Sequence, residues 1–269
     1  METDLRLLAV MAHPDDESLG VGGTLAAYAA EGIATHLITA TRGERGWTGP
    51  EEENPGLEAL GRIREAELRA AVEALRLRSL ELLGYIDGDL DQAPPGEVIG
   101  KIVAGLRRIR PQVVLTFDVF GAYGHPDHIA ISQFTAAAIV AAANPAAPYA
   151  TELEPHRVDK FYCMAFPQAL GNAYLASFGD LMMHIDGVAR GPVIWPDWAI
   201  TTQLDTARHW QTVWRAVSCH RSQLPQYAVL EHLSEEHQQA LWGTQSFYRV
   251  FSLVNGGREV ERDLFAGLR

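Results

Sequence analysis

The chain has 269 residues, of which 47% are hydrophobic and 21% are charged. This apolar content excludes an intrinsically disordered chain, and a core of this size folds without disulfides or a structural metal. The 24 glycines and 14 prolines follow no period, which excludes a collagen-like chain. The formal net charge of −12 disfavours nucleic acid and anionic membranes, so we expect neither as a partner.

Three features bear on the compartment. Cys163 and Cys219 are too few for a disulfide framework, which favours a reducing compartment. The acidic residues 1–4 lead directly into an apolar run, unlike the basic start of a signal peptide. The alanine-rich stretch after Ile129 is too short and too polar to span a bilayer. We therefore expect a cytoplasmic protein.

The first half of the chain alternates between strand-like and helix-like segments. Short apolar runs predict strands, at residues 5–12, 35–40, 80–83 and 113–117. Apolar residues at helical spacing predict helices, at residues 21–32, 57–77, 98–109 and 129–143. This repeated order of strand and helix predicts a parallel α/β sheet with right-handed crossovers.

Beyond residue 143 the pattern is weaker. It predicts a loop at 144–155, a fifth strand at 160–165, an irregular stretch at 171–198, an amphipathic helix at 204–217 and a last strand at 247–254. Tryptophans at 195, 198, 210, 214 and 242 are expected to pack this part as core, with a minority lining the rim of a sugar-binding pocket.

No linker is long enough to separate a second domain, and we find no internal repeat. We therefore expect one α/β domain over residues 1–269. Residues 1–143 would form a Rossmann-like parallel sheet flanked by helices, with a metal site at the C-terminal ends of its strands. Residues 144–269 would form an elaborated part on the substrate side.

Two short motifs share one form, in which the end of a strand leads into His-Pro-Asp, then a residue that can bind metal, then a helix. The first covers residues 13–17 (HPDDE) and the second covers residues 125–128 (HPDH). In open α/β sheets, ligands bind beyond the carboxyl ends of the strands, where the strand order reverses. If the first and fourth strands are neighbours there, the two motifs face each other across one crevice.

Both motifs carry ligand types of a divalent metal such as Zn²⁺. His13 and Asp16 are three residues apart, as are His125 and His128, and this spacing on a helical turn places side chains on one face. The prolines would lie in the first turn of each helix, where φ is already suitable. The alternative for one motif alone is a histidine that caps a helix, or acids that complement a helix dipole. Two such motifs in one sheet favour the metal.

Two other kinds of site are disfavoured. The glycine-rich residues 20–23 lack the G-x-G-x-x-G spacing of a dinucleotide loop, and the preceding acids would repel a pyrophosphate. The sequence contains no G-x-S-x-G motif, which argues against a serine hydrolase.

Together, the two motifs resemble those of the LmbE-like or PIG-L family of zinc-dependent de-N-acetylases. Members remove acetyl groups from N-acetylglucosamine-type sugars, including mycothiol and bacillithiol precursors. Shorter segments also resemble the family, at residues 41–46 (T-x-G-E-x-G), 64–68 (R-x-x-E-L), 84–88 (G-Y-x-D-G) and 220–223 (H-x-S-Q). Residues 145–200 match no family segment, and substrate choice is expected to vary there.

The resemblance implies that His13, Asp16 and His128 bind the zinc ion and that Asp15 is the general base. Zinc lowers the pKa of bound water to about 7, which provides the nucleophile that amide hydrolysis needs at neutral pH. Asp15 is adjacent to Asp16 in the chain and can point elsewhere.

The resemblance also implies that His125 stabilises the oxyanion or protonates the leaving amine, that Asp127 orients it, and that Tyr123 assists at the oxyanion. Histidine suits this task because the amine leaves only when protonated, and imidazole titrates near neutral pH. Whether Asp15 serves as both base and acid stays open.

Substrate contacts are implied for Arg64, Asp87 and Glu44. Arg64 lies on the apolar face of its helix, so its charge needs an acceptor. It either extends past the sheet edge to solvent or reaches over the strand ends into the crevice. Asp87 is alternatively a simple turn residue. His220 is either a structural residue or a neighbour of the ligands.

Other functions stay open. Two histidines and a carboxylate also describe non-haem Fe(II) oxygenases, so Fe²⁺ is a second candidate metal, although those sites usually lie on all-β scaffolds. A non-catalytic metal-binding module is a third reading, and an intact Asp15 argues against it. The expected partner is a small acetylated amino sugar. Free N-acetylglucosamine, a chito-oligomer, a thiol-sugar precursor, and an antibiotic or nucleoside conjugate all remain candidates, and a homo-oligomer is left open.

Overall fold

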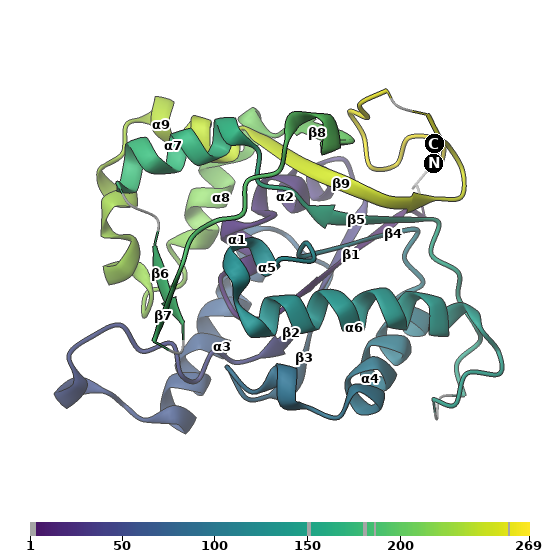
Figure 1. Ribbon diagram of the computed structural model, residues 1–269, viewed down its shortest axis with the longest axis horizontal. Helices are drawn as coiled ribbons and strands as arrows, with labels where there is room; N and C mark the ends of the chain where they lie inside the picture. The colour runs from purple at the N-terminus through teal and green to yellow at the C-terminus, as the bar shows by residue number, and fades with distance from the viewer. Residues whose placement is uncertain (1–3, 150–151, 180–181, 186, 258) are drawn as a thin grey trace.

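The computed structural model describes residues 4–149, 152–179, 182–185, 187–257 and 259–269, so residues 1–3 of the acidic start lie outside it. A seven-stranded sheet with the order β3-β2-β1-β4-β5-β9-β8 forms its centre (Figure 1). Its strands are β1 (Arg6–Met11), β2 (Ala34–Thr41), β3 (Ser79–Tyr85), β4 (Val113–Thr116), β5 (Lys160–Met164), β8 (Thr202–Asp205) and β9 (Thr244–Ser252).

The predicted α/β class is confirmed, and so is the position where the strand order reverses. Strand β1 pairs in parallel with β2 on one side and with β4 on the other. Strands β3 and β5 extend the parallel part at its two ends. Strand β9 then pairs antiparallel with β5, and β8 antiparallel with β9, so the whole sheet is mixed.

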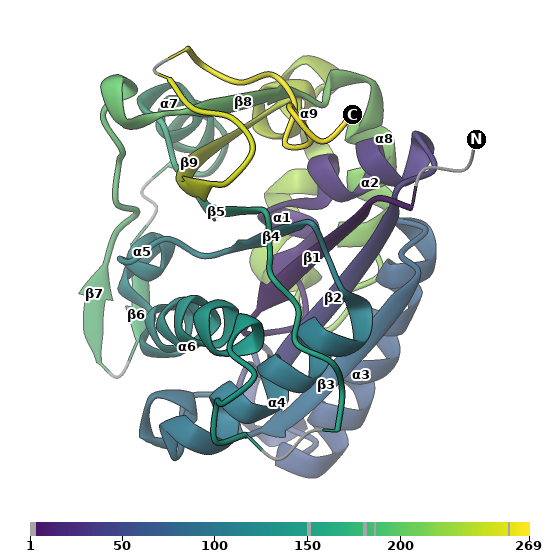
Figure 2. The ribbon, with the colours of Figure 1, turned by 90° about the vertical axis from the view of Figure 1, so that its right-hand side faces the viewer.

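Helices cover both faces of the sheet, as Figure 2 shows. Helices α4 (Pro95–Ile109) and α6 (Pro126–Ala143) pack together on one face, whereas α2 (Gly22–Ala30) and α3 (Leu57–Ala74) contact α8 (Trp210–Val217) on the other. The helices predicted in the first half are all present. Two short helices, α1 (Asp16–Leu19) and α5 (Gly121–Gly124), follow β1 and β4 at their carboxyl ends.

The second half contains more regular structure than its sequence predicts. The single helix expected at 204–217 is wrong, because Thr202 and Leu204 are buried while Asp205 is exposed, an alternation that suits strand β8 paired with β9. Only α8 is α-helical there. The stretch expected to be irregular contains α7 (Gln168–Phe178) and an antiparallel hairpin of β6 (Met183–Ile185) and β7 (Val188–Arg190). Helix α9 (Glu235–Trp242) follows, capped by Ser234.

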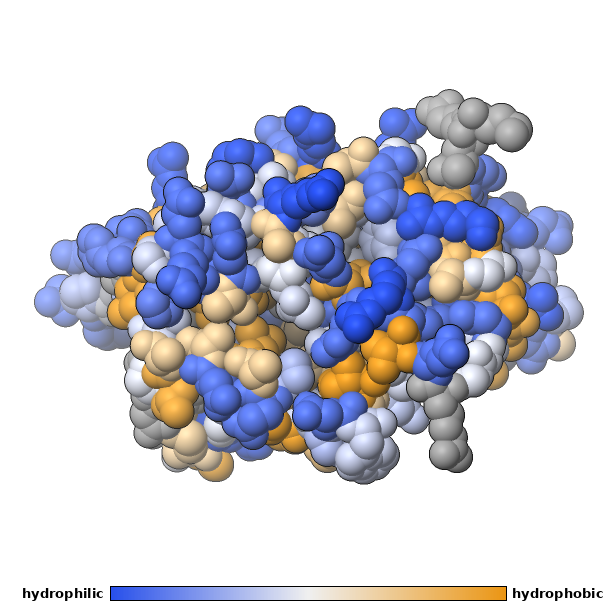
Figure 3. Space-filling view, turned by 90° about the horizontal axis from the view of Figure 1, so that it is seen from above, coloured by the Kyte–Doolittle hydropathy of each residue, from blue (hydrophilic) through white to orange (hydrophobic). Residues whose placement is uncertain are grey.

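Single-turn 3-10 helices connect several elements, at Glu51–Glu53, Leu90–Gln92, Asp197–Ala199 and Ala207–His209, and a longer one covers Leu224–His232. No helix in the described ranges is long and apolar enough to cross a membrane. Seen from above, the face over α7, α9, β8 and β9 is largely hydrophilic, with hydrophobic residues in separate patches (Figure 3).

The main core lies around β1, whose residues 7–11 are completely buried, as is Ala12 directly after it. A second apolar cluster joins α8 to α9 and contains Trp210 and Trp242, with Trp214 packed against it. These three tryptophans are core, as predicted. Trp198 is 87% exposed and is not core, because it lies in a 3-10 turn on the surface.

Candidate active site

The two His-Pro-Asp motifs meet at the carboxyl ends of β1 and β4, beside α1 and α5 in Figure 1. The Nδ1 atom of His13 lies 3.1 Å from Nε2 of His128. The Asp16 carboxylate lies 3.6 Å from the first of these nitrogens and 3.4 Å from the second. The structure therefore brings the three predicted ligands to one point.

These distances fit a single metal ion. Two atoms bound to one tetrahedral zinc at about 2.0–2.1 Å lie roughly 3.3 Å apart. Within the described residues, His125 also has a ring nitrogen within 4.8 Å of those of His13 and His128, and Asp87 and Asp127 form a second such group with His13. Each of the two ring nitrogens of His13 therefore lies near other atoms that can bind a metal.

Hydrogen bonds on the far side of each ring show which nitrogen faces the ligand point. The Nε2 atom of His13 lies 3.1 Å from both Asp127 and Asp87. The Nδ1 atom of His128 lies 3.3 Å from the carbonyl oxygen of Gly121. When those nitrogens carry the protons, the lone pairs of His13 Nδ1 and His128 Nε2 point to the Asp16 carboxylate. Partners of this kind orient histidines that bind metals.

The Asp127 carboxylate is completely buried and serves His13, whereas the resemblance implied that it orients His125. Its oxygens also accept the backbone N–H groups of Gly88, at 2.7 Å, and Leu90, at 3.1 Å. The ring of His125 instead caps helix α6, because its Nδ1 accepts the backbone N–H of Asp127 at 3.1 Å. The capping alternative for this histidine is therefore real, and it leaves Nε2 available.

The pKa values of the clustered residues shift in different directions. Burial alone would raise the pKa of Asp16, but His128 and His13 beside it hold that pKa well below its ordinary value. Burial lowers the pKa of His128 to about 3, which keeps its imidazole neutral. Burial also opposes a charge on His13, yet the carboxylates of Asp127, Asp16 and Asp87 raise its pKa well above the usual value.

Asp15 differs from its neighbour Asp16 in conformation and in partner. Its backbone φ is 105°, a value rare for residues other than glycine, and helix α1 begins only after it. The expectation that Pro14 lies in the first helical turn is therefore wrong, although Pro126 does begin α6. Burial raises the pKa of Asp15 to about 6, and the Arg64 guanidinium opposes that rise.

Arg64 reaches over the strand ends from α3, and its side chain is only 4% exposed. Its guanidinium donates to the carbonyl oxygens of Gly43, at 2.9 Å, and Pro14, at 2.6 Å, and to Oδ2 of Asp15, at 3.2 Å. The loop folds so closely around it that a Cβ built on Gly43 would lie 2.2 Å from Nη1. Of the two alternatives for Arg64, the structure selects the crevice.

The shorter segments that resemble the family contact one another around this site. Glu44 accepts the backbone N–H of Asp87 at 3.2 Å, which joins residues 41–46 to residues 84–88. Glu67 accepts the N–H and the hydroxyl of Ser222, and Gln223 donates to the carbonyl oxygen of Gly46. Segments far apart in the chain are thereby tied together behind the ligand point.

Tyr123 lies over the histidines. Its ring meets that of His128 edge-on at 5.2 Å and that of His125 at 6.1 Å. The kink that places it there includes Ala122 at φ 62°. Burial raises the pKa of its hydroxyl, so the phenol keeps its proton.

The elaborated second half contributes a wall beside α5. Val193 donates its backbone N–H to the carbonyl oxygen of Ala122 at 2.8 Å, and Trp195 donates its indole N–H to Asp118 at 2.5 Å. Figures 1 and 2 both place the β6-β7 hairpin next to α5. A Cβ built on Gly124 would lie 3.2 Å from Nη1 of Arg190 in this hairpin. Arg190, Val193 and Trp195 thus lie beside the segment that holds Tyr123 and His125.

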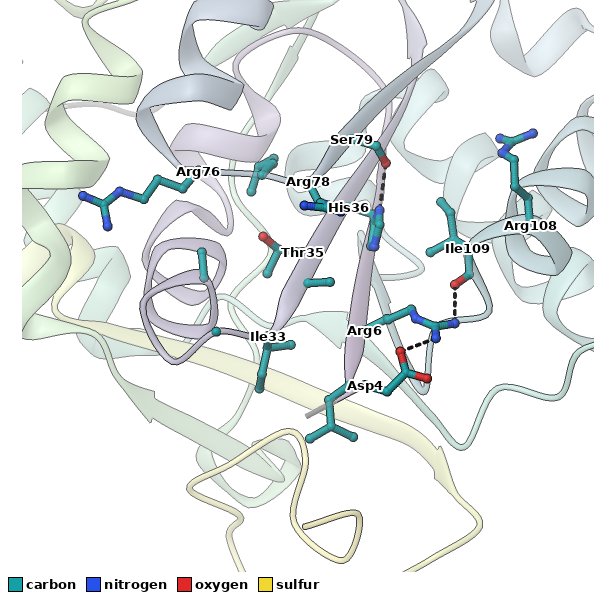
Figure 4. Close-up of a pocket in the computed structure, with 15 residues that line it drawn as sticks. Asp4, Arg6, Ile33, Thr35, His36, Arg76, Arg78, Ser79, Arg108 and Ile109 are labelled. Atoms are coloured by element: carbon teal, nitrogen blue, oxygen red, sulfur yellow. Dashed lines mark hydrogen bonds and ion pairs between the residues drawn. The ribbon is translucent and has the colours of Figure 1, made fainter. Parts of the chain in front are cut away.

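A separate hollow of about 1000 Å³ lies at the opposite, amino-terminal ends of β1, β2 and β3 (Figure 4). Arg6 there pairs with Asp4 and with a carbonyl oxygen at the end of α4, and His36 contacts Ser79 at 2.7 Å. Helix C-termini carry partial negative charge, which arginines complement. Arg6 therefore stabilises the end of α4, away from the ligand cluster.

Comparison with known proteins gives a consistent result. A model of the family described as GlcNAc-PI de-N-acetylase (PIG-L) matches residues 8–139. A deacetylase of Geodermatophilus obscurus, named for 1D-myo-inositol 2-acetamido-2-deoxy-alpha-D-glucopyranoside, is 36% identical over 298 residues, which cover 100% of this chain and 99% of that protein. The chain belongs to the PIG-L family. A deacetylase of the same name from Kineococcus radiotolerans is 34% identical over 300 residues, covering 98% of this chain and 83% of the relative.

Solved structures agree on the fold of this PIG-L protein. N,N'-diacetylchitobiose deacetylase from Pyrococcus horikoshii superposes with a TM-score of 0.69 over 91% of this chain and 83% of that chain, at 19% identity. Family membership makes the protein an amide-hydrolysing enzyme of the deacetylase type. Its His/Asp cluster could bind a metal ion.

Sequence reasoning missed two groups near the site. In the sequence, Glu17 is only one of three adjacent acids at a helix start, yet it is fully buried and accepts the backbone N–H of Asp15. Asp118 belongs to no motif, although it comes just after strand β4, where functional carboxylates of parallel sheets lie. Its position was the available signal.

Proposed function

We propose that this protein is a zinc-dependent deacetylase that removes the acetyl group from an N-acetylglucosamine-type sugar joined to a second polar group. One observation carries the proposal, namely the convergence of His13, Asp16 and His128 within 3.1–3.6 Å. The names of its relatives support an acetamido sugar linked to inositol as the substrate class. The two free cysteines support a reducing compartment, and we propose the cytoplasm.

In this proposal, His13, Asp16 and His128 hold the zinc ion. When bound there, zinc lowers the pKa of a water molecule to about 7 and polarises the amide carbonyl. Zinc suits the donor set because imidazole nitrogens and a carboxylate are among its ordinary ligands. The buried and neutral imidazole of His128 is ready to bind without first losing a proton.

Asp15 takes the proton from the attacking water in this mechanism. Its carboxylate is not among the three converging groups, and Arg64 holds one of its oxygens at 3.2 Å. The guanidinium therefore fixes the direction of the carboxylate that accepts the proton in this proposal. Such a positioned base contributes about 10²–10⁴-fold to the rate.

His125 and Tyr123 act on the other side of the scissile bond. The Nδ1 atom of His125 accepts a backbone N–H, so a proton delivered to the leaving amine comes from Nε2. The protonated Tyr123 hydroxyl is a donor for the oxyanion. Asp127 supports the reaction indirectly, by fixing the ring of His13.

Two of the three residues for which the resemblance implies substrate contacts have partners within the protein. Arg64 and Glu44 are engaged with the protein's own loops, so we propose that they shape the pocket rather than bind a sugar hydroxyl. Asp87 accepts from the backbone N–H of Arg45 with one oxygen and faces His13 with the other. A direct sugar contact for Asp87 stays a prediction.

The test combines metal analysis with an acetate-release assay on acetamido sugars, including the inositol conjugate, N-acetylglucosamine and a chito-oligomer. We expect zinc bound at one equivalent and fastest release from the conjugate. The Asp15→Asn variant should keep its metal but lose roughly 10²–10⁴-fold in kcat. Wild-type turnover in Asp15→Asn would overturn the base assignment. Iron in aerobically purified protein, with no acetate released, would favour the non-haem Fe(II) alternative.

A further inference from the structure

The Glu17 carboxylate lies directly behind Asp15 and is completely buried. One oxygen accepts the backbone N–H of Asp15 at 3.0 Å. The other accepts from the Ser18 hydroxyl at 2.5 Å and lies 2.8 Å from Nε2 of His220. A buried carboxylate is costly without a charged or hydrogen-bonding partner, and His220 supplies one.

Asp15 needs contacts from other residues because its backbone conformation is strained. A φ of 105° lies in the left-handed region, where a residue with a Cβ is strained unless its surroundings hold it. Glu17 holds the peptide nitrogen of Asp15, and Arg64 holds its side chain. The two contacts act on opposite ends of the same residue, so together they determine where its carboxylate points.

His220 reaches this position from the turn after α8, 203 residues along the chain from Glu17. The contacts of Ser222 with Glu67 and of Gln223 with Gly46 hold that turn against the site. The ring is 1% exposed, and its Nδ1 finds no hydrogen-bond partner among the described residues. Since buried polar atoms are normally satisfied, a histidine kept here for packing alone would be a poor choice.

We propose that Glu17 and His220 form a positioning pair for Asp15. His220 fixes the Glu17 carboxylate, and Glu17 fixes the Asp15 peptide in its left-handed conformation. The base is thus positioned by a residue of the second half of the chain, which acts on it through Glu17. This inference rests on the proposed function, in which Asp15 is the base.

The first test replaces His220 by leucine and by glutamine. A glutamine side chain can still donate a hydrogen bond to Glu17, whereas leucine cannot. We expect His220→Leu to lower kcat by about 10²-fold, because small displacements of a reacting group cost this much. Its KM should stay within about two-fold and its metal content should not change. His220→Gln should recover most of the lost kcat.

The matched control is His156→Leu. His156 is also buried, and its Nε2 contacts the carbonyl oxygen of Pro111 at 2.7 Å, far from the site. This variant should lose stability in thermal unfolding and keep its kcat. Equal kcat in His220→Leu and His220→Gln, or metal loss in both, would mean a merely structural role and would overturn the proposal.

A double-mutant cycle with Glu17→Gln tests whether His220 acts on Asp15 through Glu17. If His220 acts through Glu17, the double variant loses little more kcat than the worse single variant, whereas independent roles give multiplied losses and contradict the proposal. Crystal structures of the two His220 variants give a readout that needs no activity. Asp15 should leave φ 105° in His220→Leu and keep it in His220→Gln. If Asp15 kept this φ in both variants, the positioning pair would be refuted, whatever the activity. If the wild-type protein released no acetate, only the proposed function would be refuted.

Discussion

The two halves of this molecule contribute to the site in different ways. Residues 4–143 provide every proposed ligand and acid–base group, each placed by the end of a parallel strand or the start of the following helix. The described part of residues 152–269 provides supports, such as His220 against Glu17 and Trp195 against Asp118. The parallel half thus brings the reactive groups together, and the second half restricts how they point.

The two halves differ in this way because the site contains many buried carboxylates that need hydrogen-bond donors. Several carboxylates crowd the strand ends, at Asp15, Asp16, Glu17, Asp87 and Asp127. Backbone N–H groups of the first half satisfy some of them, as those of Gly88 and Leu90 do for Asp127. In Glu17 and Asp118 a backbone N–H group satisfies only one carboxylate oxygen, and a side chain from a distant segment, His220 or Trp195, contacts the other.

The largest effect is expected from removing a ligand in the first half. His128→Ala should lose bound metal and all measurable turnover, because two remaining side chains hold the ion poorly. Metal analysis after dialysis and an acetate-release assay measure both losses. The matched control is His36→Ala, a buried histidine near the amino end of β2, which should retain full metal. Equal metal content in the two variants would contradict the ligand assignment.

An intermediate effect is expected where the loop of the first half closes around Arg64. Gly43 has φ +66°, and a Cβ there would lie 2.2–2.7 Å from the guanidinium. Gly32 has φ +83°, and a Cβ there would meet no described atom within 4 Å. Alanine at either position costs about 1–2 kcal/mol of backbone strain.

Only Gly43→Ala must also displace Arg64, so its kcat/KM should fall by about 10²-fold while that of Gly32→Ala stays near wild type. Steady-state kinetics and urea unfolding of both variants separate activity from stability. Similar kcat/KM values for the two would show that the position of Arg64 matters little to the reaction.

The smallest effect concerns the second half, where Glu261 joins β5 to β8. Burial opposes its charge, but hydrogen bonds from donors that include Lys160, at 2.7 Å, and Tyr162, at 2.7 Å, lower its pKa to about 2. The folded protein therefore holds the proton less tightly than the unfolded chain. Its stabilising contribution is complete above the ordinary pKa of about 4.3 and disappears as the pH falls toward 2.

The free energy of unfolding should thus fall by on the order of 2 kcal/mol through this group between pH 5 and pH 2, judged by urea unfolding. Glu261→Gln should flatten that part of the pH dependence, whereas the exposed Glu259→Gln should not. An unchanged slope in Glu261→Gln would assign the acid sensitivity to other carboxylates, including those of the site.

Much of the first half could be predicted because its signals are local. Apolar runs such as residues 5–12 and 113–117 identify buried strands, and a strand–helix repeat permits few topologies. The second half could not be predicted as well, because an antiparallel edge strand such as β8 depends on a partner, β9, that lies some forty residues later. A four-residue alternation has no strong period of its own.

The sequence by itself determined which residues are proposed to carry the chemistry, since His-Pro-Asp followed by a ligand type is a property of neighbouring residues. It also determined that both motifs follow strands, and therefore that they can meet. Only the tertiary structure decided that Asp127 serves His13, that Arg64 turns inward, and that Glu17 and His220 stand behind Asp15. Such pairings depend on the burial of charge between distant segments, and burial is a property of the packed molecule rather than of any stretch of chain.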